Sequence, residues 1–504
     1  MPETSVSLAE MVGQALARDA ALPAIEFEDQ WHTWGDLRRI AHELDRCLAS
    51  SGIRPDAPVA FVPRNTPASI AALLALLAGQ RTVRMVYAFQ SPSVIGSEIE
   101  RLAPAAAIVD SADLAKDIAP TLAEAGIAGI VLNNGSVAPI AGAHLAHGEA
   151  ALRKGPQTPL IEILTSGTTG PPKQFPITHK MIAESMVGAA ALNPAAQAAA
   201  ATLAPYLLYF PLGNISGIYS TIPTLVRGQR ACLLDRFSIA DWHRYVLRHR
   251  PTHSGIPPAS MRALLDADIP VGDLASIKAM GIGAAPLPPG LQRQFEQCYG
   301  IPVLLSYGAT EFGGPVCAWS PDLHAQWGAT KLGSVGRPIL GAQLRIIDLE
   351  TGTEAACGTV GRVEVISPRI GPEWIRTADL GSIDQDGFLF LAGRTDSAIM
   401  RGGFKILPDT IERALLQHSA VAEVAVVGVP DKRLSEVPAA MVCLANGMQS
   451  TTVATLQRHL RDTLPSTHLP VHWLITDSLP RNASMKIDLQ AIRCIFNTLH
   501  SHDL

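Results

Sequence analysis

Apolar residues occur in two alternating patterns along most of the chain, and these patterns predict short buried strands separated by helices. Continuous apolar runs typical of buried strands occur at residues 57–62, 106–109, 130–132, 231–234, 277–282 and 302–305. Helical spacing of apolar residues appears between such runs, at 68–77 and 240–250. This alternation is typical of α/β layers with parallel strands, in which ligands gather at the carboxyl ends of the strands.

The pattern of apolar residues changes near residue 343, where shorter strand patterns separated by glycine turns begin. Runs at 343–347, 361–366 and 388–391 predict a β-rich subdomain. After Gly393 the pattern alternates between helical and strand spacing, which is typical of a compact α+β unit. We therefore predict an α/β protein with a large N-terminal domain of layered sheets plus the β-rich subdomain, residues 1–393. A small mobile α+β domain, residues 394–504, is expected to follow, with a hinge at about 394–398.

Composition narrows the class of protein. A chain of 504 residues with 47% hydrophobic content is too long for one core, which agrees with two domains. The net charge of −5 leaves no broad basic field, so we expect no nucleic-acid partner. No secretory signal is evident at the N-terminus, and the richest apolar run, 70–79, is about half a membrane span. We expect a cytoplasmic monomer or homodimer.

Cysteine and histidine positions indicate neither disulfides nor a zinc site. The seven cysteines include no C-x-x-C pair, which predicts reduced thiols. His243, His249 and His253 lie among arginines without an accompanying cluster of ligands in the sequence. We therefore interpret them as part of a solvated polar face.

The segment from Leu164 to Lys173 carries the strongest chemical signal. It combines hydroxyl side chains, two glycines and a lysine directly after the apolar run 160–164. Glycines let the backbone approach an anion, N–H groups and hydroxyls donate to its oxygens, and Lys173 supplies a positive charge. The glycine spacing and Gln174 differ from the usual P-loop pattern. The segment predicts a polyphosphate site, with an ordinary surface loop as the alternative.

Five further segments carry candidate chemistry, at residues 281–287, 306–311, 377–381, 393–396 and 480–488. The first is small enough to lie against a planar ring. The second combines Tyr307, a hydroxyl and Glu311 at the end of a predicted strand. Asp379 is an acidic residue of the kind that accepts ribose hydroxyls, and Lys486 lies on a polar loop. Taken singly, each residue could equally be a core aromatic, a turn carboxylate or a surface lysine.

In this order and at this separation, the six segments resemble the adenylate-forming superfamily of acyl-CoA synthetases, stand-alone adenylation domains and firefly luciferase. The resemblance covers about residues 25–490. It implies that ATP and Mg²⁺ activate a carboxylic acid to acyl-AMP with release of pyrophosphate. A thioester with coenzyme A would then form, after a rotation of the small domain withdraws Lys486.

The resemblance also implies roles for individual residues. Lys486, Thr310, Glu311 and Lys173 would be catalytic, with Glu311 as the Mg²⁺ ligand. Lys486 would bridge the carboxylate and the α-phosphate, where positive charge offsets the approach of two anions. The implied nucleotide-binding residues are Thr165, Ser166, Gly167, Thr168, Thr169, Gly170, Gly283, Ala284, Ala285, Pro286, Ser306, Tyr307, Gly308, Asp379 and Arg394.

The expected substrate is a hydrophobic carboxylic acid of aryl, alicyclic, terpenoid or fatty type. The implied pocket residues are mostly small or apolar, namely Phe210, Gly213, Asn214, Gly281, Phe312 and Val316. The absence of a carboxylate between 210 and 218 argues against an α-amino acid. Asn214 stands where many CoA ligases carry a histidine that gates the acyl pocket, so the nature of that gate stays open.

The acceptor is expected to be coenzyme A. Gly402, Gly403 and Phe404 resemble the segment of CoA ligases that admits the pantetheine arm, and no carrier-protein domain follows Lys486. The alternatives are an acyl-AMP ligase that loads a separate carrier protein, a luciferase-like monooxygenase and a non-catalytic nucleotide-binding homologue.

Several positions depart from the family pattern. Met485, Ala378 and Ser397 replace residues usual in the family, and we expect these replacements to tune rates rather than abolish activity. Arg81 and Arg84 fall where the family is usually apolar, and the sequence offers no explanation for them.

Overall fold

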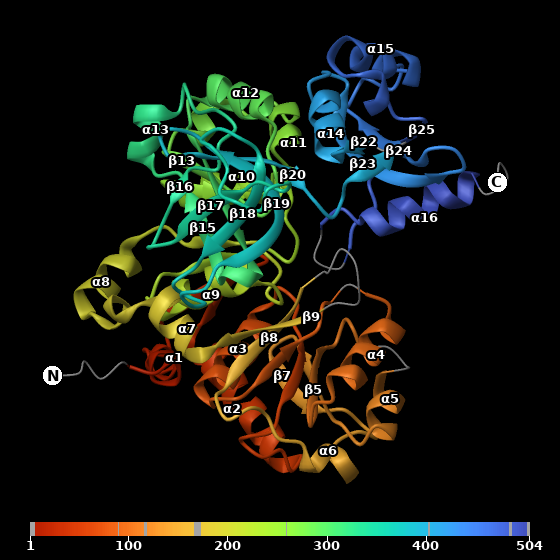
Figure 1. Cartoon of the computed structure of the whole chain (residues 1–504). Helices are drawn as coiled ribbons and strands as arrows, with labels where there is room; N and C mark the ends of the chain where they lie inside the picture. Colours follow the sequence, from red (N-terminus) through yellow and green to blue (C-terminus); the bar gives the residue numbers. More distant parts are fainter. Residues whose placement is uncertain are drawn as a thin grey trace. The chain divides into compact units, whose positions relative to one another are not determined.

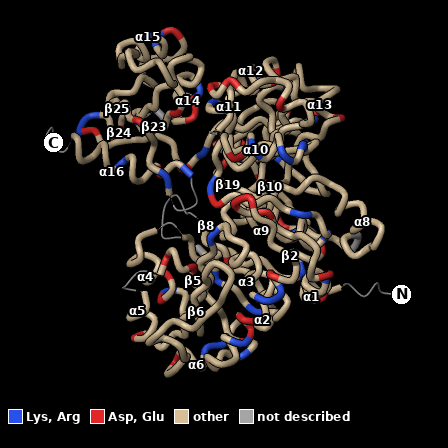
Figure 2. The backbone as a smooth tube through the Cα atoms, turned by 180° about the vertical axis from the view of Figure 1, so that it is seen from behind, with Lys and Arg blue, Asp and Glu red and all other residues tan. Residues whose placement is uncertain are grey.

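The chain folds into two compact units in a computed structural model (Figure 1), which describes residues 6–88, 90–114, 118–165, 173–258, 260–401, 404–482 and 486–500. The first unit comprises residues 1–167, 171–254 and 309–314, and the second comprises 168–170, 255–308 and 315–504. Basic and acidic residues are interspersed along the backbone (Figure 2). Among the described residues, no helix is long and apolar enough to span a membrane.

A seven-stranded sheet forms the larger core of the first unit. Its order is β7-β6-β5-β3-β4-β8-β9, and the strands from β6 to β8 in this order pair in parallel. Only the edge strands β7 and β9 pair antiparallel with their neighbours. The predicted parallel α/β arrangement is therefore confirmed. The strands are β3 (Val59–Val62), β4 (Val83–Met85), β5 (Ala106–Asp110), β6 (Ala128–Asn133), β7 (Ser136–Pro139), β8 (Leu160–Thr165) and β9 (Lys173–Thr178).

Helix α3 (Pro67–Ala78) illustrates how the sequence sets an element of this core. Thr66 caps its N-terminus by accepting the N–H of Ser69, and Pro67 occupies the first turn, where no N–H is needed. Its residues are buried on every side except at the last position, because the helix packs against both α1 (Leu8–Leu16) and α2 (Trp34–Ser50). A helix without a polar face is typical of such a buried position.

A second sheet of the first unit has the order β10-β11-β1-β2. Strands β1 and β11 pair in parallel, and β1 pairs antiparallel with β2. The elements of this region are β1 (Pro23–Phe27), β2 (Gln30–Thr33), β10 (Tyr206–Leu208), β11 (Ala231–Leu233), α9 (Ile215–Val226) and α10 (Ile239–His249). Ser238 begins α10 by accepting the N–H of Asp241.

Five further strands pair in the order β12-β13-β14-β15-β16. They are β12 (His253–Gly255), β13 (Ala279–Ile282), β14 (Val303–Ala309), β15 (Gly314–Ala318) and β16 (Arg337–Pro338). The β-rich region predicted after residue 343 is an antiparallel sheet of β17 (Gln343–Ile347), β18 (Gly361–Ile366), β19 (Ile375–Ile383) and β20 (Leu389–Arg394). The segment 377–381, for which a turn was an alternative, lies inside strand β19.

The C-terminal part of the second unit has helices on both faces of a sheet. Alternate residues of β23 face opposite sides, so Val424 and Val426 join one apolar cluster while Ala425 and Val427 join another. Helices α14 and α15 cover the first cluster, and α16 covers the second. The elements are β21 (Ile399–Arg401), β22 (Phe404–Ile406), β23 (Val421–Asp431), β24 (Ser435–Leu444), β25 (His472–Thr476), α14 (Pro408–Leu416), α15 (Val453–Thr463) and α16 (Leu489–His500). The domain boundary at residue 394 and its hinge stay predictions.

The remaining helices are short connections. They are α4 (Pro92–Leu102), α5 (Ile118–Glu124), α6 (Gly148–Leu152), α7 (His179–Met181), α8 (Pro194–Thr202), α11 (Ser260–Asp266), α12 (Pro289–Tyr299) and α13 (Pro321–Trp327).

Arg81 and Arg84 have structural roles that the sequence did not reveal. Arg84 on β4 lies opposite Glu162 on β8, and its Nε donates to the Glu162 carboxylate at 2.7 Å. Its Nη1 also donates to the carbonyls of Leu102 and Ala103 at the end of α4. Arg81 donates to the carbonyl of Arg54 at 2.8 Å. Both arginines therefore satisfy partly buried acceptors of the first unit.

Candidate active site

Three of the predicted nucleotide-binding residues lie together in the second unit. Tyr307, on β14, donates its hydroxyl to Asp379 Oδ2 at 2.6 Å. Arg394 donates from Nη1 to Asp379 Oδ1 at 2.9 Å. Asp379 and Arg394 face each other across β19 and β20. The Asp379 carboxylate on β19 therefore binds a phenol from β14 and a guanidinium from β20.

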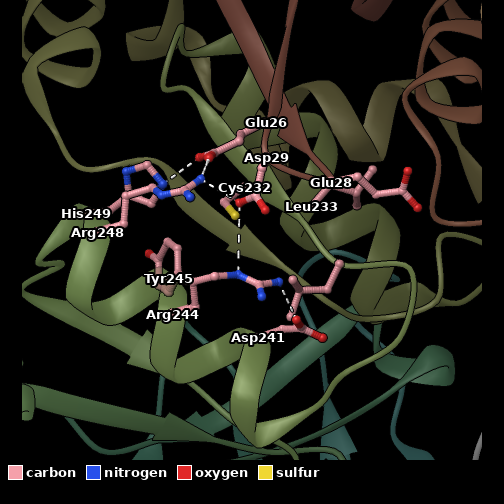
Figure 3. Close-up of a pocket in the computed structure, with 11 residues that line it drawn as sticks. Glu26, Glu28, Asp29, Cys232, Leu233, Asp241, Arg244, Tyr245, Arg248 and His249 are labelled. Carbon is pink, nitrogen blue, oxygen red and sulfur yellow. Dashed lines mark hydrogen bonds and ion pairs between the residues drawn. The ribbon is translucent and has the colours of Figure 1, made fainter.

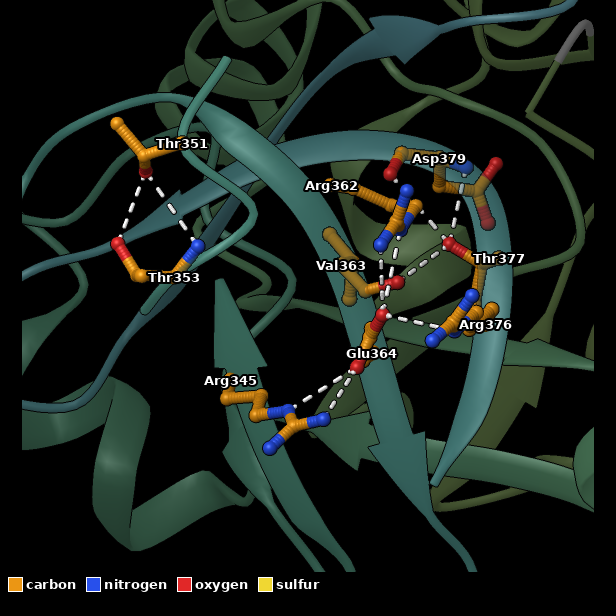
Figure 4. A network of polar contacts seen from close by, with 9 residues as sticks. All are labelled: Arg345, Thr351, Thr353, Arg362, Val363, Glu364, Arg376, Thr377 and Asp379. Carbon is orange, nitrogen blue, oxygen red and sulfur yellow. Dashed lines mark hydrogen bonds and ion pairs between the residues drawn. The ribbon is translucent and has the colours of Figure 1, made fainter. Parts of the chain in front are cut away.

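The backbone at Asp379 is fixed by its neighbour Thr377. The Thr377 hydroxyl accepts the Asp379 N–H at 2.9 Å and donates to the carbonyl of Val363 at 2.7 Å (Figure 4). This contact ties β19 to β18 where β19 pairs irregularly with its partner. The position of the Asp379 carboxylate is therefore set by the sheet rather than by a loop.

Glu364, on β18 of the same sheet, has a buried carboxylate. Its carboxylate is 2% exposed and forms ion pairs with Arg345 and Arg362, both shown in Figure 4. Burial raises the pKa of Glu364, but the hydrogen bonds from the two arginines outweigh it, so the pKa lies below its ordinary value. This charged cluster stabilises the sheet that presents Asp379.

The charges around Asp379 suit recognition of hydroxyl groups. Burial, followed by the negative charge of Asp379, raises the pKa of Tyr307, so this residue stays a neutral donor. The pKa of Arg394 is raised chiefly by its hydrogen bond to Asp396, and Asp379 adds to the effect. Each carboxylate oxygen can accept more than one hydrogen bond. The Asp379 side chain is 17% exposed, which leaves it accessible to a ligand.

The glycine-rich segment at 281–287 runs beside the same tyrosine. Strand β13 pairs in parallel with β14, with Ile282 opposite Leu305. A Cβ placed on Gly283 would lie 2.5 Å from Ser306 Oγ, so a side chain there would push the serine aside. The structure therefore brings the predicted Gly283, Ser306 and Tyr307 together within the second unit.

In the first unit, the end of β8 lies beside Tyr87, a residue that the sequence analysis missed. Its hydroxyl donates to the carbonyl of Leu164. Burial, with a further contribution from the negative charge of Glu311, raises the pKa of Tyr87 to about 12. Glu311 lies in a 3₁₀ turn, Thr310–Phe312. A polar residue just after strand β4 is the signal that could have drawn attention to Tyr87.

The predicted phosphate loop is described only at its two ends. Thr165 ends β8 and Lys173 begins β9, and the two residues are paired across these antiparallel strands. Ser166, Gly167, Thr168, Thr169 and Gly170 lie outside the described residues.

Three of the predicted acyl-pocket residues, Phe210, Gly213 and Asn214, follow strand β10 in the first unit. The carbonyl of Phe210 accepts a hydrogen bond from Asn65 at 3.2 Å. A Cβ on Gly213 would lie 3.4 Å from Pro63 and 3.9 Å from Tyr87, so this segment passes close to Tyr87. Phe312 is buried in the first unit; in the second unit Val316 is buried and Gly281 exposed.

Asn214 has a structural function that its position in the motif did not indicate. It caps α9, because its Oδ1 accepts the N–H of Gly217 at 2.8 Å. Its side chain is thus already committed to a hydrogen bond within this unit.

The backbone of residues 211 and 212 packs closely against Gly217, and a substitution can test this packing. A Cβ at residue 217 would lie 2.2 Å from the carbonyl oxygen of Pro211 and 2.7 Å from the Cα of Leu212, both backbone atoms. Gly217→Ala is therefore expected to lower the free energy of unfolding by about 1–3 kcal/mol, measured by urea denaturation. Gly13→Ala is the matched control, since its Cβ would meet no atom within 4 Å, and it should leave stability unchanged or raised. Equal stability of the two variants would contradict the packing described here.

Lys486 lies on a closed polar loop of the second unit and is exposed. Asn482 closes the loop: its Oδ1 accepts the Lys486 N–H at 3.1 Å, and its own N–H donates to the Lys486 carbonyl at 2.8 Å. The neighbouring residues 483–485 lie outside the described part, as do Gly402 and Gly403. Phe404 begins strand β22.

Comparison with known proteins identifies the family. The sequence matches the AMP-binding enzymes over residues 13–372, and the C-terminal domain of AMP-binding enzymes over residues 410–486. The chain belongs to the AMP-binding enzyme family. This agrees with the family expected from the six motifs and with the expected enzyme class, an AMP-forming acid–CoA ligase.

Individual relatives are CoA ligases by name. A 2-succinylbenzoate–CoA ligase of Bacillus pumilus is 29% identical over 345 residues, which are 65% of this chain and 67% of the relative. A long-chain-fatty-acid–CoA ligase of Bacillus subtilis is 30% identical over 343 residues, 64% of this chain and 59% of that relative. The solved o-succinylbenzoate CoA synthetase of Bacillus subtilis, in complex with its acyl-adenylate, has a TM-score of 0.74 at 24% identity, and covers 96% of this chain and 97% of its own. The last comparison confirms the fold.

Proposed function

We propose that this AMP-binding enzyme uses ATP and Mg²⁺ to convert a carboxylic acid into acyl-AMP and pyrophosphate, and then transfers the acyl group to coenzyme A. The observation that carries the proposal is the family match over residues 13–372, which includes Tyr307 on strand β14 and Glu311 in the 3₁₀ turn that follows it. The relatives named as CoA ligases support the acceptor.

Nucleotide binding is assigned to the group around Asp379. Its carboxylate would accept the ribose hydroxyls, because both of its oxygens are already oriented by Tyr307 and Arg394. The ring of Tyr307 would stack on adenine beside the segment 283–286. Arg394 would balance the negative charge of Asp379. Its guanidinium is itself held in place by two hydrogen bonds to Asp396, of 2.9 and 2.7 Å.

Catalysis of the first step is assigned to groups that offset negative charge. A carboxylate that approaches a phosphate brings two anions together, so the rate depends on positive charge fixed nearby. Exposed Lys486 would supply one such charge, and Lys173, with the segment 165–170, would hold the phosphates. The Glu311 carboxylate fits a magnesium ion, which takes carboxylate oxygens and phosphates as ligands. Bound magnesium would supply further positive charge, and Thr310 would contact the α-phosphate or the acid.

The acid is proposed to be hydrophobic. Phe210 and Tyr87 are partly exposed aromatic residues, and the segment at Gly213 lacks a side chain that would fill the space beside Tyr87. Asn214 is uncharged, and its side chain caps α9. The segment around it therefore presents no charged group to the acid. An uncharged aromatic lining favours an aryl, alicyclic, terpenoid or fatty acid over an α-amino acid.

The acceptor step is proposed to involve Gly402, Gly403 and Phe404 together with a rotation of the region that follows residues 394–398. The test is to supply ATP, Mg²⁺ and the best acid from a panel of hydrophobic acids, with either coenzyme A or a phosphopantetheinylated carrier protein. We expect mass spectrometry to detect the acyl-CoA thioester. A thioester found only on the carrier protein would reassign the acceptor. Formation of acyl-AMP with neither thioester would reject the second step.

A further inference from the structure

Three side chains with different metal-binding atoms converge in the first unit. The Glu26 carboxylate, the Cys232 thiol and the His249 imidazole each offer one ligand atom, and these atoms lie within 4.8 Å of one another (Figure 3). Glu26 is 4% exposed, Cys232 9% and His249 12%. Two of the three residues are therefore buried, and His249 is partly buried.

The fold brings these residues together from three elements. Glu26 on β1 and Cys232 on β11 are direct partners across two parallel strands, so their side chains project from the same face of the sheet. His249 is the last residue of α10, which Arg250 ends in a left-handed conformation. The end of this helix thus places the imidazole against the paired strand residues.

Neighbouring groups already orient the ligands. The His249 ring makes edge contact with Trp31, at 6.3 Å between ring centroids, and also contacts Tyr245, at 5.5 Å. The two Glu26 oxygens have separate partners: Arg248 binds Oε1, and His249 Nε2 binds Oε2. Arg248 is itself held by Asp29 at 2.7 Å. The oxygen that faces the imidazole is therefore distinct from the one that the arginine holds.

The charge of the surroundings favours a cation. A small cavity of about 40 Å³ adjoins the three residues, which is room for a water molecule. Its lining contains four carboxylates, those of Glu26, Glu28, Asp29 and Asp241, but only two guanidinium groups, those of Arg244 and Arg248. Carboxylates thus outnumber guanidinium groups in this lining.

We propose that Glu26, Cys232 and His249 bind a divalent metal ion of the zinc type. A thiolate, an imidazole and a carboxylate are the ligands that Zn²⁺ takes in proteins, and a water in the adjoining cavity would complete four-fold coordination. Glu26 Oε2 would turn from His249 to the ion, while Arg248 would stay on Oε1 and orient the carboxylate.

Binding of the metal ion would release a proton and cross-link three elements of the fold. The ion displaces the thiol proton, which passes to solvent, and an S–metal bond forms without any change of oxidation state. Because its ligands lie on β1, β11 and α10, the ion would hold the helix to the sheet and stabilise this part of the unit.

Sequence analysis leads to a different expectation for His249. It was interpreted as part of a solvated face because no ligand lies close to it in the sequence, and the structure shows this to be wrong. Its partners are separated from it by 17 and 223 residues, so only the pairing of β1 with β11 reveals the group.

The test uses the full-length protein and Co²⁺ as the probe. We expect one equivalent of Co²⁺ to produce thiolate-to-cobalt charge-transfer absorption, and Zn²⁺ to abolish it and raise the melting temperature. Cys232→Ser and His249→Gln should each lose both responses. Cys317→Ser, at another buried cysteine, and His243→Gln, on the same helix, are the matched controls and should retain both.

Two variants at different ligands keep the test decisive if one of them folds poorly. Circular dichroism establishes which variants retain the fold. No charge-transfer absorption in the wild-type protein would overturn the proposal. So would absorption that survives in a folded Cys232→Ser or His249→Gln variant, because the ion would then be bound elsewhere.

Discussion

Replacement of Lys486 by alanine is expected to slow acyl-adenylate formation by about 10²–10³-fold, because one positive charge opposite two approaching anions is lost. The side chain is exposed, and the loop is held by Asn482 through backbone groups of Lys486 that alanine retains. The fold and the melting temperature should therefore be unchanged. The measurement is the single-turnover rate of pyrophosphate release with a saturating acid.

Lys180→Ala is the matched control for this substitution. The Lys180 side chain is 76% exposed, and its ion pair with Glu184 is a long one of 3.9 Å, so its loss should leave the rate within about twofold. A Lys486→Ala enzyme with unaltered pyrophosphate release would remove this lysine from the mechanism. Equal losses in both variants would indicate a general effect of surface charge.

Replacement of Asp379 by asparagine is expected to weaken ATP and AMP binding by about 10–100-fold. The substitution removes the charge that binds Arg394 and that would accept the ribose hydroxyls, and hydrogen bonds to charged groups contribute about 1.5–3 kcal/mol each. Tyr307→Phe should have a smaller effect, since it removes one hydrogen bond to Asp379 and keeps the carboxylate. Both affinities are measured by isothermal titration calorimetry.

Asp386→Asn serves as the control in the same unit. Its carboxylate pairs with Lys331, which keeps a second partner in Asp384, so nucleotide binding should not change. Wild-type affinity in Asp379→Asn would contradict the assignment of the nucleotide site. A weaker binding that is equal for Asp379→Asn and Tyr307→Phe would place the tyrosine, rather than the carboxylate, at the centre of recognition.

The sequence predicted most of the fold, because local apolar periodicity determines the type of an element. The all-apolar run 68–77 identified the buried helix α3, and the short runs at 57–62 and 106–109 identified two strands, which the structure shows to be adjacent and parallel. The alternation of Val424 and Val426 with Ala425 and Val427 places helices on both sides of β23, but which helix covers which face depends on contacts that periodicity does not encode.

Long-range contacts explain what the sequence did not reveal at the sites. Tyr87 is linked to Leu164 across the sheet, Arg84 to Glu162 across β4 and β8, and Glu26 to Cys232 across β1 and β11. In each case the partner is fixed by strand order, which a single sequence does not state. Conversely, Asp379 and Arg394 could be proposed from their motifs, and the structure adds the pairing of β19 with β20 that joins them.

Acid-dependent release of pyrophosphate is the measurement that tests the account most directly. Wild-type enzyme is incubated with ATP and Mg²⁺ and a panel of aryl, alicyclic, terpenoid and fatty acids, each with and without coenzyme A, beside the Lys486→Ala variant. We predict release that requires one class of acid, rises strongly with coenzyme A and is lost in the variant. Release that is independent of any acid, or absent with every acid while ATP still binds, would contradict the proposed adenylate-forming activity.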